Sequence, residues 1–207
     1  PPARLLYLPD NTSPAPDPNN LQDPTGLRYG DGLPDRNPTG DISVPFTCDI
    51  PRSAVSGAGS MATATQVKPV RPTLYGHGLL GDQGEVNGQA SDFGNVYGFM
   101  NCAADWFGFA SGDLPNVATV LVDLSNFPVI PDASQQGMLN QMFLARLLVH
   151  PQGFASDSRF QANGQPVFDR REVFYHGNSQ GGILGGVLIA ASKDINRGTL
   201  GVLGLAY

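Results

Sequence analysis

The chain has 207 residues, of which 41% are hydrophobic and only 14% are charged, and its formal net charge is -6 at pH 7. A typical globular domain carries roughly 25% charged residues, so the surface is expected to be unusually neutral. The 26 glycines and 18 prolines follow no period and are separated by apolar runs, which excludes collagen-like and globally disordered chains. The acidic balance, with no basic cluster beyond Arg170 and Arg171, argues against nucleic acid as a partner.

No stretch approaches the roughly 18 to 20 consecutive apolar residues of a membrane-spanning helix, so we expect no membrane span. The N-terminal residues lack the basic and apolar regions of a signal peptide, so any such peptide is expected to be already absent. The two cysteines, Cys48 and Cys102, are too few for a disulfide framework or a metal site of usual spacing. They allow either one disulfide bridge or two buried free thiols, and no metal or cofactor is predicted.

Residues 1–40 differ in composition from the rest, with nine of the eighteen prolines and many Asp, Asn and Gly residues. This composition favours turns and extended chain, so the segment is predicted to be an irregular arm. Its oxygen-bearing side chains suit a calcium ion, but they lack the EF-hand spacing, and a solvated acidic loop is the simpler interpretation. The calcium candidates are Asp17, Asn19, Asp23, Asp31, Asp35 and Asp41.

Residues 41–207 are predicted to form the folded domain. Residues 42–51 (ISVPFTCDIP) are rich in β formers but interrupted by proline, which predicts an edge strand. The Gly-, Ser- and Ala-rich residues 53–64 predict a flexible turn. The run Pro72–Gly78 predicts a short buried strand, and the helical spacing of apolar residues predicts a helix over Phe93–Ala110.

Apolar runs and helical patterns then alternate. The continuous apolar run Ala118–Ser125 predicts a strand buried on both faces of a parallel sheet. The later elements are predicted as a helix at Ser134–Val149, a hairpin turn at Asn163-Gly164, a strand at Val173–Gly177, a helix at Ile183–Ser192 and a last strand at Gly201–Tyr207. This alternation predicts an α/β fold with a mostly parallel sheet, in which ligands bind at the carboxyl ends of the strands.

A G-x-S-x-G motif follows the strand Val173–Gly177 and opens the next predicted helix. In this context the serine, Ser179, occupies a tight strand-to-helix turn that exposes its hydroxyl, while the glycines keep side chains away from neighbouring elements. The amides at the start of the helix, and the positive end of its dipole, point to where an oxyanion would form. Ser179 is therefore the predicted nucleophile.

A second motif, HGLLG, ends the earlier strand Pro72–Gly78. Its glycines let backbone amides approach a substrate oxygen, so the amides of Leu79 and Gln180 would form an oxyanion hole. His77 and Gly78 are expected to support this loop rather than to act as the base.

The segments TLYGHGLLG and FYHGNSQGG resemble the oxyanion-loop and nucleophile-elbow motifs of the α/β-hydrolase fold, and they are most similar to those of secreted bacterial esterases and lipases. The resemblance covers about residues 41–207. It implies an α/β-hydrolase-type, mostly parallel sheet with flanking helices, with Ser179 as nucleophile and the amides of Leu79 and Gln180 as oxyanion donors. The central strands would be Pro72–Gly78, Ala118–Ser125, Val173–Gly177 and Gly201–Tyr207.

The sequence departs from this family after Ser179. In α/β hydrolases the acid and the histidine follow the nucleophile, whereas residues 180–207 contain Asp194 as their acid and no histidine. A serine without an adjacent base is a poor nucleophile. The three histidines, which all precede the serine, are His77, His150 and His176. For His176, in a predicted buried strand, a hydrogen-bonded core imidazole is the simpler interpretation.

The predicted sheet is also incomplete at its C-terminal edge, because a parallel strand at an edge leaves N–H and C=O groups unpaired. We therefore expect a further C-terminal polypeptide, as a separate chain or a continuation, that supplies the acid, the histidine and the closing strands.

The sequence predicts a secreted or periplasmic serine hydrolase that cleaves a carboxylic ester through an acyl-enzyme at Ser179. Two alternatives stay open. The missing histidine favours a catalytically inactive, hydrolase-like module that binds a ligand or partner, whereas a peptidase or amidase on the same fold would use the same residues. The acidic surface and the two cysteines suit an extracytoplasmic protein.

Overall fold

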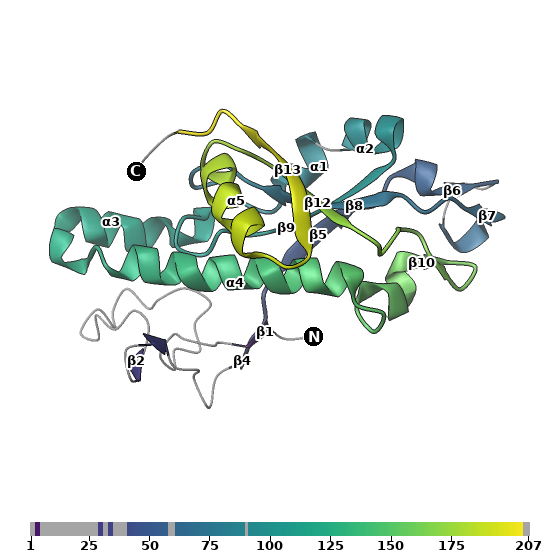
Figure 1. Ribbon diagram of the computed structural model, residues 1–207. Helices are drawn as coiled ribbons and strands as arrows, with labels where there is room; N and C mark the ends of the chain where they lie inside the picture. The colour runs from purple at the N-terminus through teal and green to yellow at the C-terminus, as the bar shows by residue number, and fades with distance from the viewer. Residues whose placement is uncertain are drawn as a thin grey trace. The chain divides into compact units, whose positions relative to one another are not determined.

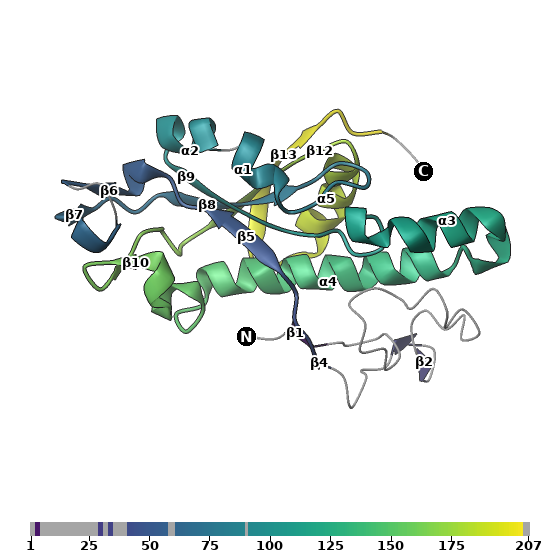
Figure 2. The same cartoon turned by 180° about the vertical axis from the view of Figure 1, so that it is seen from behind.

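The computed structural model describes residues 41–204 apart from 58–60 and 90, together with the two-residue strands β1, β2 and β3. Over these residues the protein has a mixed α/β fold built on a five-stranded, mostly parallel sheet (Figures 1 and 2). The strands are β1 (Ala3–Arg4), β2 (Tyr29–Gly30), β3 (Leu33–Pro34), β4 (Asp41–Ile42), β5 (Phe46–Asp49), β6 (Val55–Ser56), β7 (Gln66–Val67), β8 (Arg71–Gly76), β9 (Phe99–Ala104), β10 (Gln161–Ala162), β11 (Gln165–Pro166), β12 (Val173–Asn178) and β13 (Ile195–Gly201). The α-helices are α1 (Glu85–Gln89), α2 (Ser91–Tyr97), α3 (Leu114–Val122), α4 (Val129–Val149) and α5 (Gln180–Ala191).

The chain divides into two compact units. The sheet unit holds all five strands of the large sheet and comprises residues 46–78, 83–104 and 141–207. The helical unit holds α3 and the first part of α4 and comprises residues 1–45, 79–82 and 105–140. Among the described helices, none combines the length and the apolar character that crossing a bilayer requires.

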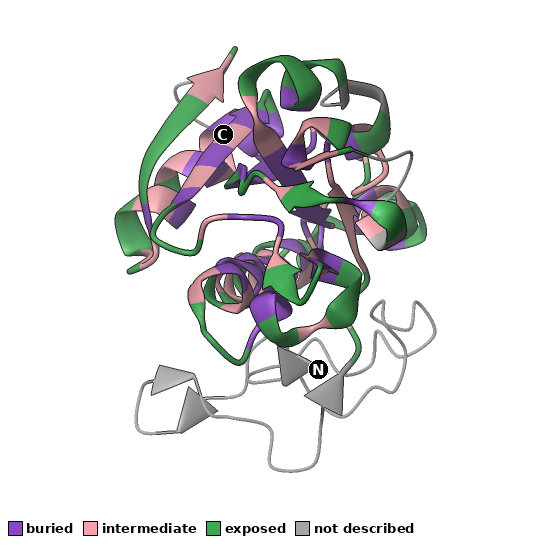
Figure 3. Cartoon of the chain, turned by 90° about the vertical axis from the view of Figure 1, so that its right-hand side faces the viewer, coloured by how far each residue is buried: buried purple, intermediate pink, exposed green. Residues whose placement is uncertain are grey.

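The strand order of the large sheet is β13-β12-β8-β9-β5, in which β5 runs antiparallel to β9 and the other pairs are parallel. The middle strand, β8, is buried from Pro72 to Gly76, as expected for a strand covered on both faces. Side chains of β12 alternate between the faces: Tyr175 lies against α5, whereas the ring of His176 contacts Phe93 of α2. The two helices therefore cover opposite faces, and buried residues follow the central strands (Figure 3).

Most elements around the sheet agree with the sequence-based predictions. The predicted strands at Pro72–Gly78 and Val173–Gly177 are confirmed as β8 and β12, and the residues 42–51 contain the edge strand β5. The helices predicted at Ser134–Val149 and Ile183–Ser192 are confirmed as α4 and α5, although both begin earlier than predicted and α5 ends one residue before Ser192. The Asn163-Gly164 turn joins β10 and β11, and the residues 53–64, predicted as a flexible turn, include the short strand β6.

The helix predicted over Phe93–Ala110 is wrong for its second half. Helix α2 ends at Tyr97, and Gly98 follows with a φ of 69°, a left-handed conformation that commonly terminates helices. Residues 99–104 then form β9, which is hydrogen-bonded between β8 and β5. The apolar residues of this segment fit the spacing of a helix and also the continuous apolar run of a buried strand. Their spacing therefore did not distinguish a helix from a strand.

The strand predicted at Ala118–Ser125 is wrong, because these residues form the end of helix α3 and a following 3-10 turn. Pro115 lies in the first turn of α3, a favoured position for proline at a helix start. Leu121 and Val122 are 72% and 89% exposed, so the apolar run that suggested a buried strand is in fact largely open to solvent. The strand beside β8 is β9 instead.

The last strand also differs from its prediction at Gly201–Tyr207. Strand β13 spans Ile195–Gly201 and is largely exposed at the sheet edge, which explains its polar sequence INRGTLG. Residues 205–207 lie outside the described residues, as do the predicted arm at 1–40, apart from its three short strands, and all the calcium candidates except Asp41.

A disulfide joins Cys48 of β5 to Cys102 of β9, which resolves the two alternatives that the sequence allowed. The two residues are direct partners in the antiparallel register, with their Cα atoms 4.0 Å apart. The bridge closes a loop of 54 residues and fixes the edge strand covalently to the sheet. Because it limits the unfolded chain, such a loop is expected to stabilise the protein.

The double variant Cys48→Ser/Cys102→Ser is expected to lose about 4 kcal/mol of unfolding free energy in the chain-entropy account of this loop. Urea unfolding of the wild type with and without a reductant, beside the variant, measures the effect. The reduced wild type should match the variant, and the variant should not respond to the reductant. Equal stability of all four samples would contradict a stabilising bridge.

Candidate functional site

Ser179 alone connects the end of strand β12 to the start of helix α5. Its backbone has a φ of 55° and a ψ of -120°, a sparsely populated conformation for a residue with a side chain. The residue is exposed, so its hydroxyl is accessible from solvent. Such backbone strain persists only where the surrounding structure imposes it, and it is frequent at functional sites.

Two glycines flank Ser179 because no side chain would fit at either position. A Cβ on Gly177 would lie 2.5 Å from the hydroxyl of Tyr175 and 2.6 Å from the carbonyl oxygen of Gly181. A Cβ on Gly181 would lie 2.0 Å from the carbonyl oxygen of Gly76, at the end of β8. Both motif glycines are thus required by close backbone approach, as the sequence predicted from steric reasoning.

Backbone hydrogen bonds hold the turn on both sides. The amide of Ser179 donates to the carbonyl of Gly201 at 3.0 Å, which ties the turn to the end of β13. The carbonyl of Ser179 accepts from the amide of Ile183 at 3.0 Å, which begins the helical bonding of α5. The strained residue is therefore fixed to a strand and to a helix at once.

Gln180 is the first residue of α5, and its side chain is only 1% exposed. As one of the first amides of the helix, its N–H has no partner within the helix and lies at the positive end of the helix dipole. Neither polar atom of its side chain has a hydrogen-bond partner among the described residues. Buried polar groups without hydrogen-bond partners are uncommon in proteins. The side chain of Gln180 is therefore a candidate for a role in the site.

His77 and Gly78 follow the end of β8, beside β12, as predicted. The buried ring of His77 has Nδ1 2.8 Å from the carbonyl oxygen of Gly78, and the His77 carbonyl would lie 2.9 Å from a Cβ on Gly181. The structure thus brings the end of this motif next to the serine turn. Leu79 is the first residue of a segment of the helical unit, and its pairing with Gln180 stays a prediction.

His176 is a core imidazole bound to a neighbour, which is the simpler of the two interpretations made from the sequence. Its Nε2 lies 3.2 Å from Oδ1 of Asn101, and its ring packs against Tyr75 with centroids 4.9 Å apart. Burial lowers the pKa of His176 to about 4, so the ring is neutral at physiological pH. Asp194 forms an ion pair with Arg146 at 3.0 Å, so this carboxylate already has a structural partner.

Sequence reasoning missed one residue beneath the serine turn, Tyr175. It is 2% exposed, and its hydroxyl donates a hydrogen bond to the carbonyl of Gly181. The signal in the sequence was an aromatic residue shortly before glycines at positions 177, 181 and 185. This pattern predicts a strand followed by a helix, but it does not predict a contact between the tyrosine and the helix.

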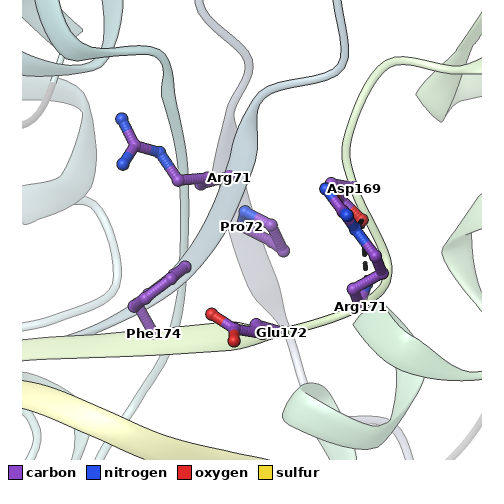
Figure 4. Close-up of a pocket in the computed structure, with 6 residues that line it drawn as sticks. All are labelled: Arg71, Pro72, Asp169, Arg171, Glu172 and Phe174. Atoms are coloured by element: carbon purple, nitrogen blue, oxygen red, sulfur yellow. Dashed lines mark hydrogen bonds and ion pairs between the residues drawn. The ribbon is translucent and has the colours of Figure 1, made fainter.

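The sheet unit contains two pockets, and the lining of the larger one reaches Asn178, the last residue of β12. A charged pocket of about 260 Å³ lies where β8 and β12 begin, and two of the charged side chains that line it, Asp169 and Arg171, form an ion pair (Figure 4). Arg71 turns away from this pair, and its guanidinium lies over the ring of Phe99. A second pocket, of about 500 Å³, lies on the sheet face opposite α5 and includes Phe93, Phe174 and His176.

The fold and the turn define an α/β protein with an exposed serine on a strained connection between a central strand and a helix. Among the described residues, no cluster of three or more His, Cys, Asp or Glu side chains could hold a metal ion. Comparison of the chain with protein-family models, with curated proteins and with solved structures found no match.

The close approach of β8 and α5 predicts opposite effects for two glycines of the same helix. Gly181→Ala should lower the free energy of unfolding by about 1–3 kcal/mol, because its methyl group would overlap the backbone of Gly76. Gly186→Ala is the matched control: its nearest neighbour would be Leu200 Cδ1 at 3.5 Å, and it should stabilise α5 by about 0.5–1 kcal/mol. Urea unfolding measures both, and equal stability of the two variants would contradict the close approach.

The buried neutral His176 predicts a loss of stability in mild acid. Its folded pKa, about 4, lies below the value of about 6.5 expected when unfolded, so the unfolded state binds more protons between these pH values. Stability should therefore fall by on the order of 3 kcal/mol as the pH drops from 6.5 to 4. His176→Gln should reduce this fall, whereas His150→Gln, at an exposed position, should leave it in place. Urea unfolding at pH 7, 5.5 and 4.5 measures it, and identical profiles for both variants would count against the assignment.

Proposed function

We propose that this protein is a serine hydrolase of the α/β-hydrolase type that cleaves a carboxylic ester through an acyl-enzyme at Ser179. The observation that carries the proposal is the backbone of Ser179, at φ 55° between two glycines that admit no side chain. A serine at a strained turn between a strand and a helix, with its hydroxyl above the carboxyl edge of the sheet, is the arrangement that this class of enzymes uses for nucleophilic attack.

The strand order adds support. The nucleophile strand β12 lies beside β8, and the carboxyl ends of parallel strands meet at one edge of the sheet. The loop after β8 carries His77 and Gly78 and leads to α1, which is the position from which hydrolases of this class supply an oxyanion donor. The amide of Gln180 would be one donor and that of Leu79 the second.

The proposed reaction has two steps. The Oγ of Ser179 attacks the ester carbonyl as its proton passes to a base, and the oxygen that becomes negative is held by backbone amides. The alcohol leaves with a proton from the same base, and the acyl group stays on Ser179. Water, deprotonated by the base, then cleaves the acyl-enzyme to give the carboxylic acid and free serine.

The base is the part of the proposal that residues 180–207 do not supply, because they contain no histidine. His176 is bound to Asn101, and its lowered pKa makes it a weak base, so it does not suit this role. Asp194, the acid in this segment, is paired with Arg146. We therefore propose that a polypeptide segment other than residues 180–207 contributes the histidine and its acid partner. The same observation favours the alternative of an inactive, ligand-binding module.

The disulfide supports a secreted or periplasmic location, because such bridges persist in oxidising compartments and are rare in the cytosol. The proposal of an ester substrate, rather than an amide, rests on the sequence resemblance alone. A peptidase would use the same serine and the same backbone amides.

Covalent labelling tests the proposed nucleophile. A fluorophosphonate probe should label the full natural protein at Ser179, identified by peptide mass spectrometry, together with turnover of a p-nitrophenyl ester. Ser179→Ala should abolish both signals, with at least a thousandfold loss of turnover in keeping with removal of a nucleophile.

Ser192→Ala is the matched control, because Ser192 follows the other end of α5 and its hydroxyl only accepts a bond from the amide of Asp194. This variant should be labelled like the wild type. The binding-module alternative replaces the hydrolase in either of two cases. The first is that the natural protein is not labelled at Ser179, and the second is that the natural protein turns over the ester no faster than the Ser179→Ala variant.

A further inference from the structure

Tyr175 lies directly beneath the serine turn and has no part in the chemistry proposed above. It belongs to β12, is 2% exposed, and faces helix α5. Its hydroxyl donates to the carbonyl of Gly181, in the first turn of α5. The same ring therefore connects the strand before Ser179 with the helix after it.

Glycines make the space that this ring occupies. A Cβ on Gly185 would lie 2.1 Å from Cε1 of Tyr175, and a Cβ on Gly177 would lie 2.5 Å from its hydroxyl. The aromatic ring thus takes the place of side chains on the strand and on the helix. Glycine at position 185 is required by the tyrosine, and glycine at position 177 by the tyrosine together with the backbone of Gly181. Neither is required by a left-handed backbone, because neither residue has a positive φ.

The first turn of α5 needs an external contact. The helix begins QGGILGG, and glycine weakens a helix because it loses more conformational freedom than any other residue on folding. The hydroxyl of Tyr175 supplies a fixed hydrogen bond to this weak turn. Burial raises the pKa of the hydroxyl well above its usual value, so Tyr175 remains a protonated donor across the physiological range.

We propose that Tyr175 is a positioning residue for the nucleophile: its hydrogen bond to the Gly181 carbonyl fixes the first turn of α5, and with it the Gln180 amide and the strained conformation of Ser179. This inference rests on the proposed hydrolase function. It is specific to the hydroxyl, since the ring alone would fill the same space without orienting the carbonyl.

Tyr175→Phe tests the hydroxyl while keeping the ring. In the full natural protein, kcat for a p-nitrophenyl ester and the rate of fluorophosphonate labelling should fall by about threefold to tenfold, the loss that one neutral hydrogen bond represents, with KM unchanged. Amide hydrogen exchange in the first two turns of α5 should accelerate by a similar factor, whereas exchange in its last turn should not change.

Thr73→Val is the matched control. It removes another buried hydroxyl, from the neighbouring strand β8, whose partner is the carbonyl of Leu74 and not α5. This variant should lose stability without slowing labelling or loosening α5. The inference is overturned if Tyr175→Phe behaves like Thr73→Val, with a lower melting temperature but unchanged kcat and exchange.

The two proposals fail separately. A wild type that is not labelled at Ser179 overturns the hydrolase function, and the exchange measurement then decides whether Tyr175 holds the turn. A labelled wild type with unchanged kcat in Tyr175→Phe keeps the hydrolase and removes the positioning role.

Discussion

The contact on which the site depends is the approach of two backbones, the end of β8 at Gly76 and the start of α5 at Gly181. They lie so close that a single Cβ on Gly181 would fall 2.0 Å from the Gly76 carbonyl. This approach leaves one residue, Ser179, to reverse the chain between β12 and α5, and it does so at a positive φ. The exposed hydroxyl is therefore a consequence of how strand and helix pack, and the strain is carried by hydrogen bonds to Gly201 and from Ile183.

The sequence predicted this region well because several local signals agreed there. An apolar run, a serine between spaced glycines and a further apolar run required the strand, the turn and the helix that β12, Ser179 and α5 provide. The pairing of Cys48 with Cys102 was left open, since sequence spacing does not contain the cross-strand register that brings them together. The contact of Tyr175 with Gly181 was out of reach for a similar reason, because it depends on which face of β12 meets α5.

The errors lie between the two motifs, where apolar content was taken as burial. Leu121 and Val122 have the β-branched and aliphatic character of a core strand, yet they lie exposed on α3. Conversely, β9 lies inside the sheet, beside β8, although its sequence FMNCAA also fits a helix, and the left-handed Gly98 marks the change. The hydrophobic pattern alone does not predict which of the two apolar segments, residues 99–104 or 118–125, forms a strand of the sheet, because tertiary packing determines this.

The disulfide has a consequence for the strand beneath the site. Residues 71–76, which form β8, lie in sequence between Cys48 and Cys102, so the bridge closes a covalent ring of chain that contains the strand meeting Gly181. The bridge, whose Cys102 is paired with Leu74 of β8 in the sheet, thus encloses the strand against which the serine turn is pressed. With the two thiols reduced, the serine turn would rest on a strand held by hydrogen bonds and packing alone, so the redox state of one cysteine pair bears on the strand beneath the site.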